Sequence, residues 1–175
     1  MASRYIPNKK LGIFESNIYN CPIDRTAIVG YETGPEYRQR YSAEDAFWQI
    51  PYFSGSNDDF VDYYLCETKV CPACFFSSSH NAHFVSRFAT PRPIELDEIL
   101  IENLISDTER RKSFGSAELL HVPRTPEFAL KSFLLARETS RTIFETNRNV
   151  YYEEAIRMAT YAIKCILISE RYGLN

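Results

Sequence analysis

Hydrophobic side chains follow a helical period in the last part of the chain, from about residue 93 onward. Leu96, Ile99, Leu100 and Leu104 recur at intervals of three and four residues. Such intervals place side chains on one face of a helix. The pattern predicts a first helix over about residues 93–111, with acidic residues in its first turn, where they suit the helix dipole.

Two further helices are predicted after a connector that contains Gly115 and Pro123. Thr125 followed by a proline is typical of a helix start, and this second helix should run to about Thr146. The third helix should end at Gly173. Its predicted apolar face consists of Tyr152, Ala155, Ile156, Ala159, Ile163, Ile166 and Leu167.

The link between the second and third helices is short, residues 147–149, so the two should pack antiparallel. The alanines of the third helix permit a close approach of the kind seen in tetratricopeptide-like hairpins. Such a hairpin either packs on its own domain or offers a groove to a partner, and a solenoid would need at least three repeats.

The first half of the chain has short apolar pieces between turn residues. The runs 26–31 and 60–70 indicate strands, and a short helix is predicted over 43–49, after Ser42. Aromatic side chains gather in this half, among them Trp48, Tyr52 and Phe53. They either fill a loop-rich core or form a surface that binds another protein.

Composition and charge narrow the class of protein. A chain of 175 residues that is 45% hydrophobic is large enough for its own core, and its net charge of −3 disfavours indiscriminate nucleic-acid binding. The sequence contains no secretion signal and no apolar run long enough to span a membrane. Five cysteines, an odd number, argue against a complete disulfide framework. We therefore expect a cytoplasmic protein.

The cysteines supply the most informative motif. Cys71-Pro-Ala-Cys74 offers two thiolates from one tight turn, which is half of a tetrahedral zinc site. Cys21-Pro-Ile-Asp24 repeats it with aspartate in the last position. The two turns together predict a zinc site in which residues 25–70 form an insertion between them.

The fourth ligand has three candidates. Asp24 has the right place in its turn, Cys66 has the softer ligand atom, and a histidine among His80, His83 and His121 is a third choice. The alternative without metal makes Cys21 a small buried side chain and leaves Cys71 and Cys74 reduced or disulfide-bonded.

The two turns, together with the aromatic stretch Tyr52-Phe-Ser-Gly-Ser-Asn57 between them, resemble the bacterial family of unknown function DUF2225. Members of that family share two C-P-x-C turns followed by a helical, often tetratricopeptide-like, region. The resemblance implies that Cys21, Cys71 and Cys74 are metal ligands, with Asp24 in the fourth position. The sequence departs from the family pattern at Asp24, which stands in place of a cysteine, and at the two phenylalanines that follow Cys74.

Motifs for catalysis are weak. The chain contains no phosphate-binding glycine loop and no serine-hydrolase elbow. A thioredoxin-like use of Cys71 and Cys74 would need a helix directly after them. The basic run of Arg110, Arg111 and Lys112 is either a solvated helix end or a nucleic-acid contact.

The sequence therefore predicts an α+β protein. A zinc-ribbon-like N-terminal part, residues 1–90, with an insertion between its turns packs on a C-terminal three-helix part with a tetratricopeptide-like hairpin, residues 91–175, and together they form one compact unit. We expect a non-enzymatic, zinc-stabilised scaffold or adaptor that binds another protein. The first alternative is a zinc-dependent nucleic-acid-binding module, and the second is a thiol-redox protein acting through Cys71 and Cys74.

Overall fold

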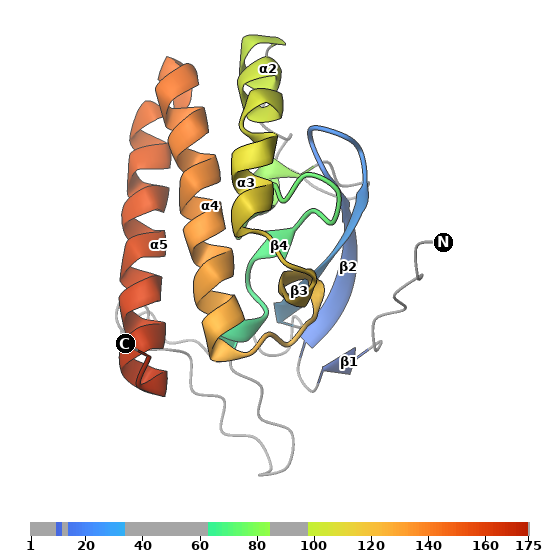
Figure 1. Cartoon of the computed structure of the whole chain (residues 1–175), viewed down its shortest axis with the longest axis vertical. Helices are drawn as coiled ribbons and strands as arrows, with labels where there is room; N and C mark the ends of the chain where they lie inside the picture. The colour runs from blue at the N-terminus through green and yellow to red at the C-terminus, as the bar shows by residue number, and fades with distance from the viewer. Residues whose placement is uncertain (1–9, 12–13, 34–62, 85–97, 175) are drawn as a thin grey trace.

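The computed structural model describes residues 10–11, 14–33, 63–84 and 98–174. These residues form an α+β fold with four α-helices and two small antiparallel sheets (Figure 1). The predicted helix over 43–49 and the predicted binding residues Trp48, Tyr52 and Phe53 lie outside the described residues.

The larger sheet has the strand order β1-β2-β3, with β1 at Lys10–Leu11, β2 at Phe14–Asn20 and β3 at Ala27–Thr33. Its register pairs Ile18 with Val29. The second sheet pairs β4, Lys69–Val70, with β5, Ser77–Ser78. The strand predicted at 26–31 is thus confirmed as part of β3, whereas the described part of the run 60–70 contains only the short strand β4 and a 3-10 turn at Tyr63–Leu65.

The first predicted helix is broken into two. Helix α2 covers Glu98–Ser106 and α3 covers Thr108–Phe114, with Asp107 between them. Short polar side chains at the break bond the backbone: Ser106 Oγ donates to the carbonyl of Asn103 at 2.8 Å. Such bonds compete with regular helix structure, which explains why the apolar period alone did not reveal the break.

Helices α4, Pro126–Thr146, and α5, Tyr151–Tyr172, match the predicted second and third helices. The ring of Phe144 stacks on that of Tyr151 at 4.1 Å, whereas Phe133 lies 6.1 Å from Tyr161. The later residue of α4 thus contacts the start of α5, and the earlier residue of α4 contacts the middle of α5. The two helices therefore run in opposite directions, and the predicted antiparallel packing is confirmed. Gly173 ends α5 with φ of 64°, as expected for a helix C-terminus.

Much of the predicted apolar face of α5 points to solvent, although Leu167 of that face packs against a buried cluster that includes Phe133 and Tyr161. Tyr152 and Ile156 on that face are 81% and 67% exposed. The buried residues of α5 are instead Glu154, Tyr161 and Ile168. The most apolar face of the helix is therefore its outer one, and Glu154 lies inside because polar partners receive it there.

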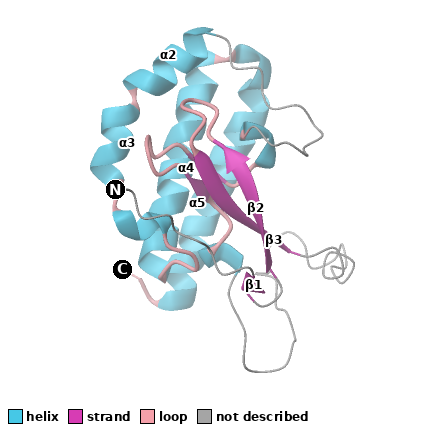
Figure 2. Ribbon diagram, turned by 90° about the vertical axis from the view of Figure 1, so that its right-hand side faces the viewer, coloured by secondary structure: helices cyan, strands magenta, loops and turns pink. Residues whose placement is uncertain are grey.

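The main core lies between the sheets and the helices. Figure 2 shows β2 and β3 lying in front of the helical layer. Buried residues from both turns join residues of α2 and α4 in one cluster: Tyr19, Cys21, Ile28, Cys71, Cys74, Phe76, Phe84, Leu100, Leu104 and Ile143. The cysteine turns thus sit where the β structure meets the helices.

Candidate metal centre

Residues 21–26 and 71–76 form two turns with the same backbone hydrogen bonds. The first cysteine of each turn donates its N–H to the carbonyl five residues later and accepts from the N–H four residues later. The bonds run from Cys21 to Thr26 (2.8 Å), Arg25 to Cys21 (3.0 Å), Cys71 to Phe76 (2.9 Å) and Phe75 to Cys71 (3.0 Å). The similarity seen in the sequence is therefore also a similarity of structure.

Each turn places a non-glycine residue in the left-handed region. Arg25 has φ of 62° and Phe75 has φ of 54°. For a residue that has a Cβ, this backbone conformation costs about 1–2 kcal/mol. For Phe75, packing of the ring against Gly115 offsets this cost. The contact is so close that a Cβ on Gly115 would lie 2.5 Å from the Phe75 ring. Arg25 is exposed.

We expect Arg25→Gly to raise the free energy of unfolding by about 0.5 kcal/mol, because relief of the backbone strain exceeds the extra freedom of glycine in the unfolded chain. Urea denaturation measures the change. Arg25→Ala is the matched control, since it removes the same side chain and keeps the strain. Equal stability of the alanine and glycine variants would contradict the expectation.

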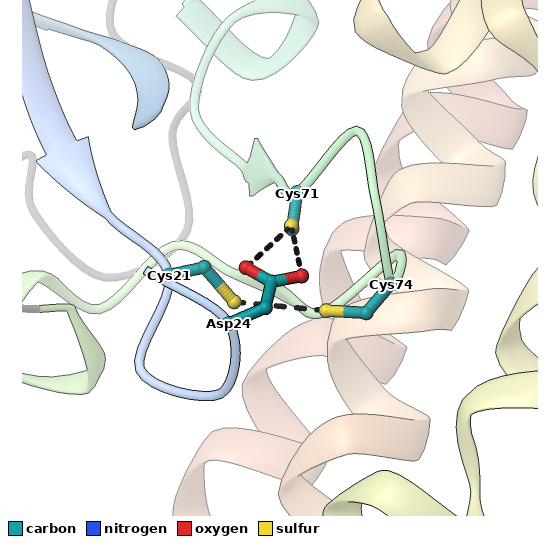
Figure 3. Close-up of side chains that lie close together, drawn as sticks. All are labelled: Cys21, Asp24, Cys71 and Cys74. Atoms are coloured by element: carbon teal, nitrogen blue, oxygen red, sulfur yellow. Dashed lines mark hydrogen bonds between the residues drawn. The ribbon is translucent and has the colours of Figure 1, made fainter. Parts of the chain in front are cut away.

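The two turns bring four ligand atoms together. One ligand atom from each of Cys21, Asp24, Cys71 and Cys74 lies within 4.8 Å of all the others (Figure 3). Cys21 Sγ lies 3.6 Å from Cys74 Sγ, and Cys71 Sγ lies 3.6 and 3.5 Å from the two carboxylate oxygens of Asp24. These four residues could hold a metal ion.

The shortest separations between ligand atoms are those expected around one tetrahedral ion, and all four atoms lie within 4.8 Å of one another. With a zinc–sulfur bond of about 2.3 Å and a zinc–oxygen bond of about 2.1 Å, a tetrahedron separates two sulfurs by about 3.8 Å and sulfur from oxygen by about 3.6 Å. The distances found in the two turns, 3.6 Å between sulfurs and 3.5 to 3.6 Å from sulfur to oxygen, are close to both values.

Burial separates the thiols from the carboxylate. Cys21 and Cys71 are fully buried and Cys74 is nearly so, whereas Asp24 is exposed. Burial would raise the pKa of Asp24, but hydrogen bonds outweigh it, the largest being the bond from the N–H of Thr26 to Oδ1 at 2.9 Å, and the net pKa is lowered. Asp24 is thus an ionised carboxylate held at the outer edge of the site.

The three thiols share negative charge. Hydrogen bonds from Cys21 and Cys74 lower the pKa of Cys71 to about 4. The pKa of Cys21 is raised by its hydrogen bonds with Cys71 and Cys74 and by burial. The hydrogen bond with Cys21 lowers the pKa of Cys74, but the hydrogen bond with Cys71 and burial outweigh it and raise this pKa to about 12. A bound cation would favour the thiolate of all three.

Arg111 of α3 supports the site from behind. Its side chain is 1% exposed, and its Nε donates to the carbonyl of Cys74 at 3.1 Å. Nη2 donates to the carbonyl of Leu104 at 2.7 Å, while Nη1 is buried without a hydrogen bond. Three thiolates and a carboxylate around a divalent ion carry a net charge of −2, so a buried guanidinium is a suitable counter-charge.

We expect Arg111→Met to lower zinc affinity by about 10- to 100-fold, the range typical for groups that support metal ligands. Arg111→Lys, which keeps the charge and loses the fork of donors, should fall between the variant and the wild type. Competition with a chromophoric chelator measures the affinity. Arg110→Met is the matched control and should leave it unchanged; equal affinities for the two methionine variants would contradict this role.

The other ligand candidates lie elsewhere. Cys66 is buried in a separate cluster with Tyr31. His83 bonds Glu154, while His121 is exposed and His80 is partly buried. In the described part of the chain, the ligand group contains neither Cys66 nor a histidine. Among the candidates for the fourth ligand, Asp24 is therefore the residue that lies with the three cysteines.

The basic run is not a free positive surface. The sequence suggested a solvated helix end or a nucleic-acid contact, but Arg111 is buried. Arg110 pairs with Asp107 at 3.2 Å, and Lys112 pairs with Glu109 at 3.0 Å. Arg111 is therefore not available to a ligand, whereas Arg110 and Lys112 lie at the surface as parts of ion pairs, as expected of a solvated helix end.

The sequence did not predict a buried row of polar side chains that begins at Ser78 of β5. Ser78 Oγ lies 2.8 Å from His83 Nδ1, and His83 Nε2 lies 3.0 Å from Glu154 Oε1. A serine, a histidine and a carboxylate in this order resemble a hydrolase triad, but Ser78 and Glu154 are fully buried. These hydrogen bonds from Ser78 through His83 to Glu154 are internal to the protein, and they join β5 to α5. Glu154 is 71 residues from His83, so no local motif signals the contact.

Comparison with protein-family models, curated proteins and solved structures gives no match. Among the described residues, none of the helices has the length and apolar character needed to cross a membrane.

Proposed function

We propose that the protein is a non-enzymatic scaffold that a structural zinc ion stabilises and that binds another protein. The observation that carries the proposal is the group of four ligand atoms within 4.8 Å of one another. Three sulfurs and one oxygen are a ligand set that zinc accepts. We also propose that the two turns form a zinc-ribbon-like unit of the DUF2225 kind, which their equal hydrogen bonds support.

A structural role for the ion is supported by the completeness of its ligand set. Catalytic zinc keeps one position open for water or substrate, whereas a structural site has four protein ligands. Here the chain offers four, and three of them are buried. The ion would join residues 21–24 to residues 71–74 and, through Arg111, to α3.

The two alternatives receive less support. For nucleic acid, the candidate contacts Arg110, Arg111 and Lys112 are paired or buried. For thiol-redox chemistry, the low pKa of Cys71 is favourable, but its sulfur is in a fully buried residue that a protein substrate does not reach. We also propose a reducing compartment such as the cytoplasm, in line with the free thiols of all five cysteines.

Elemental analysis of untagged, reduced protein tests the zinc site. We expect one equivalent of zinc per chain, lost in Cys71→Ser and retained in Cys66→Ser. The second variant is the matched control because Cys66 is a buried cysteine outside the ligand group. Absence of zinc from folded wild-type protein, or equal loss in both variants, would overturn the proposal.

A further inference from the structure

The candidate metal centre meets the solvent at one of its four ligand residues. Its three cysteines are at most 5% exposed, whereas Asp24 is exposed. Residues next to the ligands in both turns are exposed as well, namely Arg25 in the first turn and Pro72 and Ala73 in the second. A molecule from solution would therefore approach the site at Asp24.

Release from a bound ion would cost little for Asp24 and much for any of the cysteines. A carboxylate that leaves at the surface is hydrated, whereas a thiolate that leaves inside the core becomes a buried charge without a partner. Asp24 also has a hydrogen-bond donor within its own turn, because the N–H of Thr26 lies 2.9 Å from Oδ1. Of the four ligands, Asp24 is thus the one suited to exchange.

The chemistry of the site favours sulfur as the replacement. Asp24 occupies the place that Cys74 has in the matching turn, and the other three ligand atoms are sulfurs. A thiolate in this place would complete the four-sulfur set that zinc commonly binds. One negative ligand replaces another, so the net charge stays at −2 and the buried Arg111 remains a suitable counter-charge.

We infer that a small thiol from solution displaces Asp24 and binds the zinc ion as its fourth ligand. This inference rests on the proposed function, since it requires the zinc ion. In the exchange a zinc–sulfur bond forms and the zinc–oxygen bond breaks. The thiol proton passes to the solvent, Asp24 leaves as a free carboxylate, and no electrons are transferred. The three cysteines stay bound, so the ion still joins the two turns.

Absorption spectroscopy of the cobalt-loaded full chain tests the inference. Cobalt(II) accepts the ligands of a zinc site, and its sulfur-to-metal charge-transfer band grows with the number of bound thiolates. The protein is kept reduced with a phosphine and titrated with 2-mercaptoethanol. We expect the band to rise by about one third to a plateau, because a fourth sulfur joins three. Ethylene glycol, which has oxygen in place of the sulfur, is the matched probe and should leave the band unchanged.

Two variants identify the ligand that is exchanged. Asp24→Cys supplies a fourth sulfur from the chain, so its band should start at the plateau level and should not respond to the thiol. Asp24→Ala removes the competing carboxylate and should bind the thiol about threefold more tightly than the wild type. An Asp24→Cys variant that responds like the wild type, or an Asp24→Ala variant with unchanged thiol affinity, would overturn the inference.

Metal content, measured on the same samples, separates the two proposals. A chain that holds one equivalent of metal but shows no rise with the thiol overturns the inference and leaves the metal site standing. A folded chain that holds no metal overturns the proposed function. Loss of the metal when the thiol is added would also overturn the inference, because the three cysteines are expected to keep the ion.

Discussion

Removal of the metal ion is expected to lower the free energy of unfolding by at least about 4 kcal/mol. Structural zinc binds with about 10–16 kcal/mol, and much of this energy stabilises the fold because the unfolded chain has no preformed site. In this protein the ion would hold two turns that lie about 50 residues apart and are packed in the main core. Without it, three thiols that share charge remain gathered in a buried space.

Urea denaturation with and without a zinc chelator measures this loss. The matched comparison is Cys71→Ser, which should already have the stability of the chelated wild type and should not respond to the chelator. A wild type whose unfolding curve the chelator leaves unchanged would contradict a stabilising ion, even if zinc were found in the protein.

Glu154→Ala is expected to cost about 3–5 kcal/mol, the second largest effect. Glu154 is fully buried and pairs with His83 at 3.0 Å and with Arg157. Burial would raise its pKa, but the hydrogen bond and the charge of His83, followed by Ser140 and Arg157, lower it, so the carboxylate is ionised in the folded protein. Its removal leaves Arg157 and His83 without their buried partner.

Thermal and urea denaturation measure this cost, and Glu109→Gln is its control. Glu109 pairs with Lys112 at 3.0 Å but is exposed, so its loss should change the free energy of unfolding by less than about 0.5 kcal/mol. If both variants had equally small effects, Glu154 would not join α5 to β5 as described.

The candidate metal site could be predicted from the sequence because its information is local. Each sequence motif spans four residues, and the spacing of Cys71 and Cys74 already defines a pair of ligands. Asp24 stood out because it occupies the last place of the matching turn. The choice between Asp24 and Cys66 needed the structure, since softness and position in the turn gave opposite answers.

The failures share a different cause, which is burial of polar side chains by distant partners. Arg111 was expected at the surface, in a solvated helix end or a nucleic-acid contact, yet its side chain is buried and donates to the carbonyl groups of Cys74 and Leu104. Glu154 lies on the inner face of α5 because His83 and Arg157 receive it. An apolar period cannot reveal such partners, so the predicted apolar face of α5 did not include Glu154, which is buried, and did include Tyr152 and Ile156, which are exposed.

X-ray absorption spectroscopy at the zinc edge of the wild-type protein tests the central claim most directly, because it counts the atoms bound to the ion. We predict three sulfurs at about 2.3 Å and one oxygen at about 2.0–2.2 Å, as expected for Cys21, Cys71, Cys74 and Asp24. A first shell of four sulfurs, or one that contains histidine nitrogen, would contradict the site described here.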